Sequence, residues 1–194
     1  MQPAGSEAWI RTLANIPEEL KALPQWVCWA YGRPSRSGRL TKLPFNPRRT
    51  ARAMARVNDP GTWGSFAEAV ARASEGHFDG VGFVFTAGDP YCGIDLDSCR
   101  DPATGDIAAW GREFLETLSS YSELSVSGRG LHIILRGRLS GPGNRRPWAD
   151  GEVEMYDRGR YFVMTGQVLE GRTVIEDRQA QLEAVHRRVF GGAG

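Results

Sequence analysis

The sequence predicts an α+β fold that contains a mixed β-sheet. Short apolar runs with the alternation of strands interleave with segments of helical periodicity, which is the first observation that favours this class. The second is a pair of runs separated by a tight turn, as in a β-hairpin. The third is the composition: of 194 residues, 41% are hydrophobic and 24% are charged, which suits one sizeable core or two small lobes that share a core.

The N-terminal half is expected to contain helices, strands and one long loop. A short helix ends before Pro24, and a run rich in aromatic residues predicts a strand at 26–32. The following segment, 33–56, has the composition of a loop. Ser65 and Glu68 then form the pattern of a capping box, which predicts the start of a helix that ends at a glycine.

The later elements are predicted by the same two periodicities, with a Gly/Pro-rich loop at 137–150. The patterns predict strands at 80–85, 91–97 and 131–137, a helix over about 107–119, a hairpin over 152–166 that turns at 157–159, and an amphipathic C-terminal helix with Leu182, Val185 and Val189 in line. The turn "TAGDP" joins the first two of these strands.

Several classes of protein and site are excluded by the composition. No apolar run approaches the ~20 residues of a membrane-spanning helix, and no signal peptide precedes the first helix, so we expect a cytoplasmic protein without a membrane partner. Cys28, Cys92 and Cys99 are odd in number and lack CxxC spacing. They are expected to be buried reduced thiols rather than zinc ligands or disulfides.

Positive charge is concentrated in one segment, although the net charge is only +1. This basic segment contains no Asp or Glu and carries Arg33, Arg36, Arg39, Lys42, Arg48, Arg49, Arg52 and Arg56. With Arg145, Arg146 and Trp148 of the loop 137–150, it is a candidate surface for the phosphates and bases of a DNA strand. The alternative for each residue is a solvated loop.

Two aspartates lie in the predicted strand "YCGIDLD". Asp95 and Asp97 share one face of that strand and lie roughly 6–7 Å apart, whereas Ile94 and Leu96 face the core. Carboxylates on one face repel each other, and this repulsion is removed if they bind divalent cations such as Mg²⁺. The alternative is a strand that runs out into an acidic surface turn.

The segment "SVSGRGLHIIL" combines a Gly-rich turn with the start of a strand. The hydroxyls of Ser125 and Ser127, with exposed N–H groups around Gly128, are candidates for binding phosphate oxygens. His132 leaves the core face of the strand near that turn. A purely structural histidine is the alternative.

The segment "VEMYDRGRYF" supplies a further acid and an arginine. Glu154 is a candidate third carboxylate of a metal site, and Arg160 a candidate clamp for a triphosphate. A surface ion pair between the two is the alternative. Asp157 is a second candidate for the third acid, because strand alternation alone does not choose between them.

Taken in order, "GIDLD", "SVSGRGLHI" and "VEMYDRGRYFVMTG" resemble the three motifs of the archaeo-eukaryotic primase superfamily. The chain is most similar to the primase–polymerase domains of phage and plasmid replication proteins, over roughly residues 17 to 170. Val126 departs from the common form of the second motif, where a proline is usual. Ser98 and Cys99 depart from a His-Cys or similar pair that is often present, so no role is assigned to them.

The resemblance implies an RRM-like catalytic sheet with an N-terminal α/β unit packed beside it. It implies one domain over 1–194, with the α/β unit at about 17–90, the RRM-like unit at about 91–175 and a C-terminal helix and tail at 176–194. It also implies that the family's metal ligands correspond to Asp95, Asp97 and Glu154, and its nucleotide contacts to Ser127, His132, Arg160 and Lys42.

The activity implied is that of a DNA primase/polymerase that uses two Mg²⁺ or Mn²⁺ ions. Its partners would be a single-stranded template, a primer and nucleoside triphosphates, with a helicase region possible in a longer chain and a monomer expected for the isolated domain. The alternatives are a non-catalytic single-strand-binding or replication-initiation module and a metal-dependent nuclease.

Overall fold

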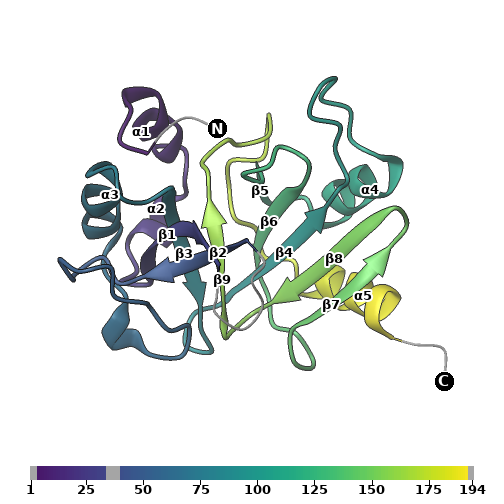
Figure 1. Ribbon diagram of the computed structural model, residues 1–194. Helices are drawn as coiled ribbons and strands as arrows, with labels where there is room; N and C mark the ends of the chain where they lie inside the picture. Colours follow the sequence, from purple (N-terminus) through teal and green to yellow (C-terminus); the bar gives the residue numbers. More distant parts are fainter. Residues whose placement is uncertain (1–3, 34–39, 192–194) are drawn as a thin grey trace. The chain divides into compact units, whose positions relative to one another are not determined.

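The computed structural model describes residues 4–33 and 40–191, and this part of the chain forms two compact units (Figure 1). Unit 1 comprises Met1–Val84 and Tyr161–Thr165, and unit 2 comprises Phe85–Arg160 and Gly166–Gly194. An α+β fold is confirmed. The expectation that both units form one primase–polymerase domain stays a prediction.

Unit 1 is built on a four-stranded sheet with the order β2-β1-β3-β9. Its strands are β1 (Trp26–Gly32), β2 (Thr41–Phe45), β3 (Gly80–Phe85) and β9 (Arg160–Met164). Its helices are α1 (Glu7–Leu13), α2 (Glu18–Lys21), the 3-10 turn η1 (Pro60–Thr62) and α3 (Phe66–Ser74). The predicted capping box of α3 is confirmed, because Ser65 and Glu68 each bond the other's backbone N–H. Trp26 is fully buried, with its ring edge-on to Phe66 at 4.8 Å.

The basic segment was predicted to be largely loop, and this prediction is wrong for 41–45. These residues form β2, which pairs in antiparallel fashion with β1 at the edge of the sheet. Pro44 is tolerated there because an edge strand does not need every N–H group for pairing. Arg36 and Arg39 lie outside the described residues.

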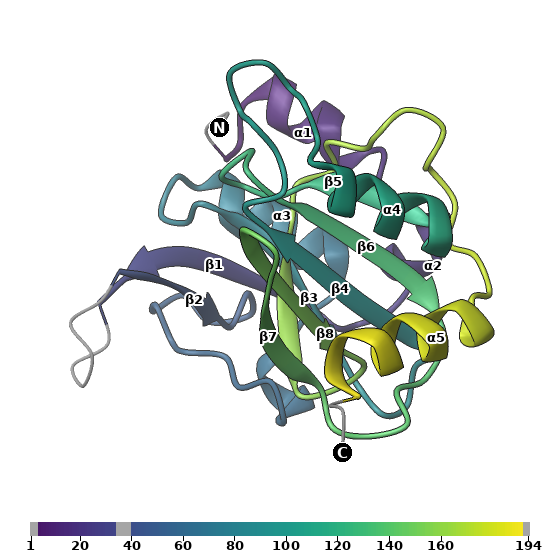
Figure 2. The ribbon, with the colours of Figure 1, turned by 90° about the vertical axis from the view of Figure 1, so that its right-hand side faces the viewer.

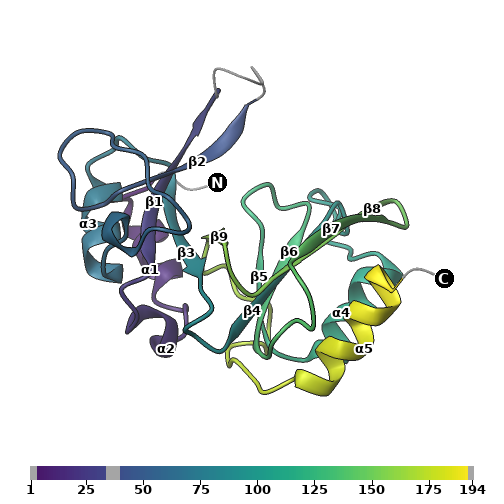
Figure 3. The same ribbon diagram turned by 90° about the horizontal axis from the view of Figure 1, so that it is seen from below.

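Unit 2 is built on a five-stranded sheet, the unit 2 sheet, with the order β5-β6-β4-β8-β7. Its strands are β4 (Tyr91–Asp97), β5 (Tyr121–Leu124), β6 (Leu131–Arg136), β7 (Asn144–Trp148) and β8 (Gly151–Tyr156). Every pairing in it is antiparallel, so the prediction of a mixed sheet is wrong here. The helices α4 (Ala109–Leu118) and α5 (Gln179–Phe190) lie on one of its faces (Figures 2 and 3).

The core of unit 2 lies between this sheet and its two helices. Ile94 and Leu96 of β4 are fully buried in it together with Phe114 of α4 and Leu182 of α5. Because strand side chains alternate between faces, the residues between these apolar positions project from the opposite face. The polar residues of β4, β6 and β8 are therefore held in place by a core that they do not enter.

Two further sequence predictions are corrected in this region. The expected loop 137–150 contains the edge strand β7. The expected hairpin 152–166 has both of its strands and its turn, but the strands do not pair with each other. Instead β8 pairs with β4 and β7, and β9 joins β3 in the other sheet.

The three cysteines are buried and free of disulfides, as predicted. Burial raises the pKa of the Cys28 and Cys99 thiols to about 12, so neither is a reactive thiolate at neutral pH. Among the described residues, no helix combines the length and the apolar character that crossing a membrane requires.

Candidate active site

One row of polar side chains crosses the whole unit 2 sheet on the face that α4 and α5 leave uncovered. The strand register places its members opposite one another in sequence across β5, β6, β4, β8 and β7: Glu123, His132, Asp95, Glu154 and Arg145. Side chains at paired antiparallel positions lie about 4.5–5.5 Å apart at Cβ, so each member is a direct neighbour of the next. We refer to this set as the polar row.

Asp95 occupies the centre of the polar row, with a partner on each side. On one side Asp95 Oδ2 lies 3.9 Å from His132 Nε2, and on the other Asp95 is the register partner of Glu154. The Asp95 side chain is 29% exposed, so it is accessible to a ligand, whereas the His132 side chain is 4% exposed. The predicted departure of His132 from the core face is confirmed by this register.

Glu154 is held by two arginines. Its Oε2 accepts a hydrogen bond of 2.7 Å from Arg160 Nη2, and its Oε1 lies 3.7 Å from Arg145 Nε. Burial and the neighbouring charge of Asp95 raise the pKa of Glu154 above its ordinary value of 4.5, although the two arginines act in the opposite direction. A carboxylate in this setting favours a further cation, because its charge is costly in a buried position.

Asp97 lies next to Asp95 on the same face, at the exposed end of β4. Its register partner is Glu152, which binds Arg145 at 2.6 Å. Within residues 4–33 and 40–191, no group of three or more His, Cys, Asp or Glu side chains is gathered closely enough to hold a metal ion. The oxygen donors of Asp95, Asp97 and Glu154 fit Mg²⁺ or Mn²⁺ in chemistry and in sharing one face, while Arg160 holds Glu154.

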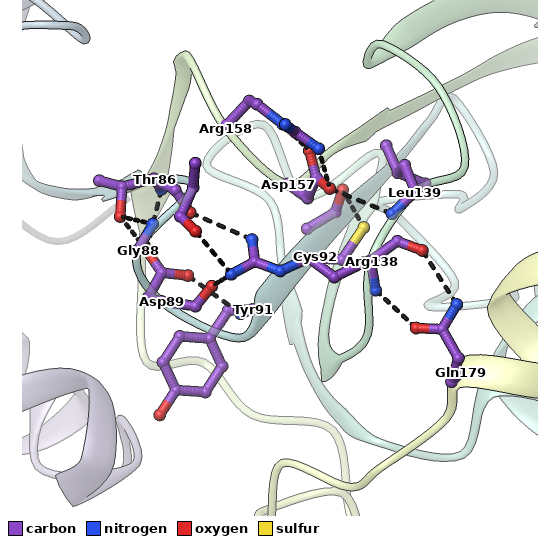
Figure 4. Close-up of polar contacts among 12 residues, drawn as sticks. Thr86, Gly88, Asp89, Tyr91, Cys92, Arg138, Leu139, Asp157, Arg158 and Gln179 are labelled. Atoms are coloured by element: carbon purple, nitrogen blue, oxygen red, sulfur yellow. Dashed lines mark hydrogen bonds and ion pairs between the residues drawn. The ribbon is translucent and has the colours of Figure 1, made fainter.

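Asp157, the alternative third acid, is buried and is not a member of the polar row. Its carboxylate accepts hydrogen bonds from the Leu139 N–H at 3.0 Å and from Arg158 Nε at 2.8 Å (Figure 4). Burial alone would raise the pKa of Asp157, but these hydrogen bonds and the charges of Arg158 and Arg138 lower it below its ordinary value of 3.8. The Asp157 carboxylate is thus occupied by hydrogen bonds that hold the surrounding loops, and the geometry favours Glu154 as the third acid.

The serine turn at the start of β6 uses most of its own donors. The Gly128 N–H donates to the Ser125 carbonyl oxygen at 2.9 Å, and the Gly130 N–H donates to Ser125 Oγ at 3.1 Å. The Arg129 N–H donates to Ser127 Oγ at 3.2 Å. Gly128 has φ of 70°, a conformation that favours glycine. The expectation of exposed N–H groups for phosphate is therefore wrong for these three. Ser127 is an exposed residue of the turn, and its hydroxyl lies 3.1 Å from Ser125 Oγ.

The residues predicted to bind DNA from loop 137–150 separate between the two faces of β7. Arg145 belongs to the polar row. Arg146 donates to Val189 O at the end of α5, and the Trp148 ring lies 6.0 Å from Phe114 in the core. Trp148 is half-buried and packs against Phe114 on the helix side, on the same face as Arg146 and opposite Arg145, and that it stacks on a base stays a prediction.

The remaining predicted contacts belong to unit 1. Lys42 lies on β2, where its carbonyl accepts a hydrogen bond from the Tyr161 hydroxyl. Arg48 forms an exposed ion pair with Glu68 at 3.2 Å, and Arg49 is exposed. The roles of Lys42, Arg48 and Arg49 stay predictions.

Glu123 is a member of the polar row that sequence reasoning missed. It is fully buried on β5, a strand that was not predicted. Its signal was present in "YSELSVSG", where one acid stands within a short alternating run directly before the serine turn.

Comparison with known proteins agrees with the motifs. No family model matches the chain. A DNA primase-polymerase from Nitratiruptor phage NrS-1 is 36% identical over 169 residues, which cover 85% of this chain and 22% of the phage protein. The predicted resemblance to a primase–polymerase is thereby confirmed, and the chain spans about a fifth of the length of that relative.

Proposed function

We propose that this chain, which matches a segment of a phage DNA primase–polymerase, is a nucleotidyl-transfer domain of the archaeo-eukaryotic primase type. Its reaction would transfer the nucleotidyl group of a nucleoside triphosphate to a primer 3′-hydroxyl or to an initiating nucleotide, with release of pyrophosphate. The observation that carries this proposal is the register pair of Asp95 and Glu154, with Asp97 on the same face and His132 and Arg160 beside it.

Asp95, Asp97 and Glu154 are the residues that would hold Mg²⁺ or Mn²⁺. Two such ions, when bound, would activate the attacking hydroxyl and stabilise the departing pyrophosphate. The carboxylates contribute negative charge on one face of a rigid sheet, and the apolar core behind Ile94 and Leu96 fixes their backbone positions.

Arg160 and His132 flank the three acids and would bind the triphosphate. The Arg160 guanidinium is about half exposed, so it can exchange Glu154 for phosphate oxygens without a change of fold. His132 presents Nε2 on the side of Asp95. The hydroxyl of Ser127, an exposed residue, is a third candidate donor if it turns from Ser125 Oγ toward a phosphate, whereas Ser125 and Gly128 would shape the turn. Lys42 of unit 1 is proposed as a weaker nucleotide or template contact.

The same set of residues favours polymerisation over the two alternatives. A single-strand-binding module does not need three acids on one sheet face, and a nuclease has no triphosphate to bind. Cationic and imidazole groups on both sides of the acids support a substrate that carries several negative charges. A single-stranded DNA template, a primer and nucleoside triphosphates are therefore the proposed partners.

An extension assay tests the proposal. The chain is incubated with primed or unprimed single-stranded DNA, nucleotides and Mg²⁺ or Mn²⁺, and the strand length is measured. We expect extension that is lost on adding a chelator and abolished by Asp95→Ala or Asp97→Ala. Shortening of the strand would identify a nuclease, and retention of the strand without a change in length a binding module.

A further inference from the structure

Glu123 is a fully buried acid at the end of the polar row, and the residues around it hold it in one position. Its Oε2 accepts hydrogen bonds from the Tyr121 hydroxyl at 2.8 Å and from the Gly166 N–H at 2.9 Å. Its Oε1 lies 3.2 Å from His132 Nδ1. The two oxygens therefore have different partners: Oε2 is held by Tyr121 and Gly166, and Oε1 faces the imidazole ring of His132.

This arrangement determines which nitrogen of His132 carries a proton. A carboxylate oxygen only accepts hydrogen bonds, so Nδ1 must be the donor. That holds for the neutral ring and for the charged ring, because Nδ1 is protonated in both. Nε2 is left as the nitrogen that faces Asp95, at 3.9 Å.

Burying a carboxylate is expensive unless its partners compensate for the lost water. The Tyr121 hydroxyl and the Gly166 N–H need an acceptor at this position, but the neutral amide oxygen of a glutamine would supply one without the cost of a buried charge. A position that only had to satisfy these two donors would therefore favour a neutral side chain. Because an acid lies opposite His132 in the register, we take its negative charge to act on the His132 ring.

We infer that Glu123 is a positioning residue for His132: by accepting from Nδ1–H it fixes the ring with Nε2 directed at the nucleotide's phosphates, to which Nε2 donates when the ring carries both protons. The phosphate part of this inference rests on the proposed function. Glu123 does not contact the substrate itself. It acts on the site in the way that outer-shell carboxylates orient imidazole groups in other proteins.

The substitution Glu123→Gln separates this role from simple packing. The Gly166 N–H is an obligatory donor, so the amide oxygen of glutamine takes the Oε2 position and its NH₂ group faces His132. Nδ1 must then accept from this NH₂ group, so the ring carries a single proton on Nε2, and its hydrogen bond to a phosphate loses the positive charge of the ring. The shape of the side chain is nearly unchanged, while the protonated nitrogen of the ring changes.

The experiment combines nuclear magnetic resonance with nucleotide kinetics. The whole chain is labelled with ¹⁵N-histidine, and the His132 signals are assigned against those of His77 and His186 with a His132→Asn variant. We expect a protonated Nδ1 in the wild type and an unprotonated Nδ1 in Glu123→Gln. The KM for the incoming nucleotide should rise roughly tenfold, with kcat changed by less than about threefold.

Tyr121→Phe is the matched control. It removes a hydrogen bond to the other oxygen of the same carboxylate and leaves the Oε1 contact with His132 intact. We expect a lower melting temperature, an unchanged Nδ1 signal and a KM within about twofold of the wild type. A KM that rises equally in both variants would show a merely structural role and overturn the inference.

An unprotonated Nδ1 in the wild type would also overturn the inference, and this can be measured even if Glu123→Gln does not fold. So would an Nδ1 signal that is the same in the wild type and in Glu123→Gln. The failure of the proposed function has a different signature. In that case the wild type extends no primer in the assay, whatever the Nδ1 signals show.

Discussion

The two faces of the unit 2 sheet come from the same strands but differ in chemistry. On the helix side, Ile94 and Leu96 are fully buried among side chains of α4 and α5. On the other side, Asp95 belongs to the polar row and Asp97 lies beside it, and burial and mutual repulsion make the charges of Asp95 and Glu154 costly. The difference teaches that neighbouring residues of one strand can serve stability and chemistry separately. Substitutions on the helix side should therefore lower the free energy of unfolding and spare extension activity, whereas substitutions on the other side should lower extension activity and spare stability.

The largest effect is expected from Asp95→Asn, which keeps the volume of the side chain and removes its charge. Primer extension should fall on the order of 10³-fold, because a group at the reacting centre is lost. The melting temperature should be unchanged or slightly higher, since Asp95 stands beside Glu154 in the register. Extension rates and thermal unfolding of the same preparation check both parts. A large loss of stability would contradict the separation of the faces.

The adjacent residue tests the opposite face. Ile94→Ala should lower the free energy of unfolding by about 2–5 kcal/mol, because it opens a cavity in the unit 2 core. Extension activity per folded molecule should stay near that of the wild type when assayed well below the melting temperature. Chemical denaturation gives the first quantity, and activity normalised to the folded fraction gives the second. A loss of activity as large as that of Asp95→Asn would show that the faces are coupled.

Asp157→Asn distinguishes the two candidates for the third acid. Its carboxylate accepts hydrogen bonds from Leu139 and Arg158 in a buried site, so the free energy of unfolding should fall by roughly 1–3 kcal/mol. Because the pKa of Asp157 is lowered in the folded state, this contribution is present above about pH 3.8 and is lost as the pH falls through the folded value. Extension should persist. Its abolition in a folded variant would assign the third acid to Asp157.

The smallest effect is expected from the ionisation of Glu154. Burial raises its pKa in the folded state, so the folded protein holds the proton more tightly than the unfolded chain does. Relative to Glu154→Gln, the wild type should therefore lose stability as the pH rises from about 4.5 through the folded pKa. Urea unfolding at a series of pH values measures this difference. A difference of the opposite sign would mean that Arg160 and Arg145 outweigh burial.

Local patterns predicted those elements whose side chains match one periodicity. The strands at 80–85 and 91–97 and the capping box of α3 were predicted with their observed bounds or contacts. The missed strands β2, β5 and β7 all lie at sheet edges. Two of them contain a proline after basic residues: β2 has Pro44 after Lys42, and β7 has Pro147 after two arginines. Such a composition suggests a loop, because the pairing that makes it a strand comes from a distant neighbour.

The candidate site was predictable only in part for the same reason. The sequence marked Asp95, His132 and Glu154 as polar positions of apolar strands, and the register places them side by side. Which strands pair is decided by long-range packing, so the supposed hairpin was wrong and Glu123 was overlooked. The packing of Trp148 against Phe114 likewise depends on α4, which is distant in sequence.

The edge of the unit 2 sheet also bears on self-association. Strand β7 ends the sheet, and an exposed edge offers backbone groups to which a second chain can add and so begin aggregation. Here Pro147 lacks an N–H group, and Arg145 and Arg146 would bring like charges together if two copies met edge to edge. Arg145 and Arg146, first considered as DNA contacts, are thus also expected to oppose edge-to-edge association of two copies of the chain.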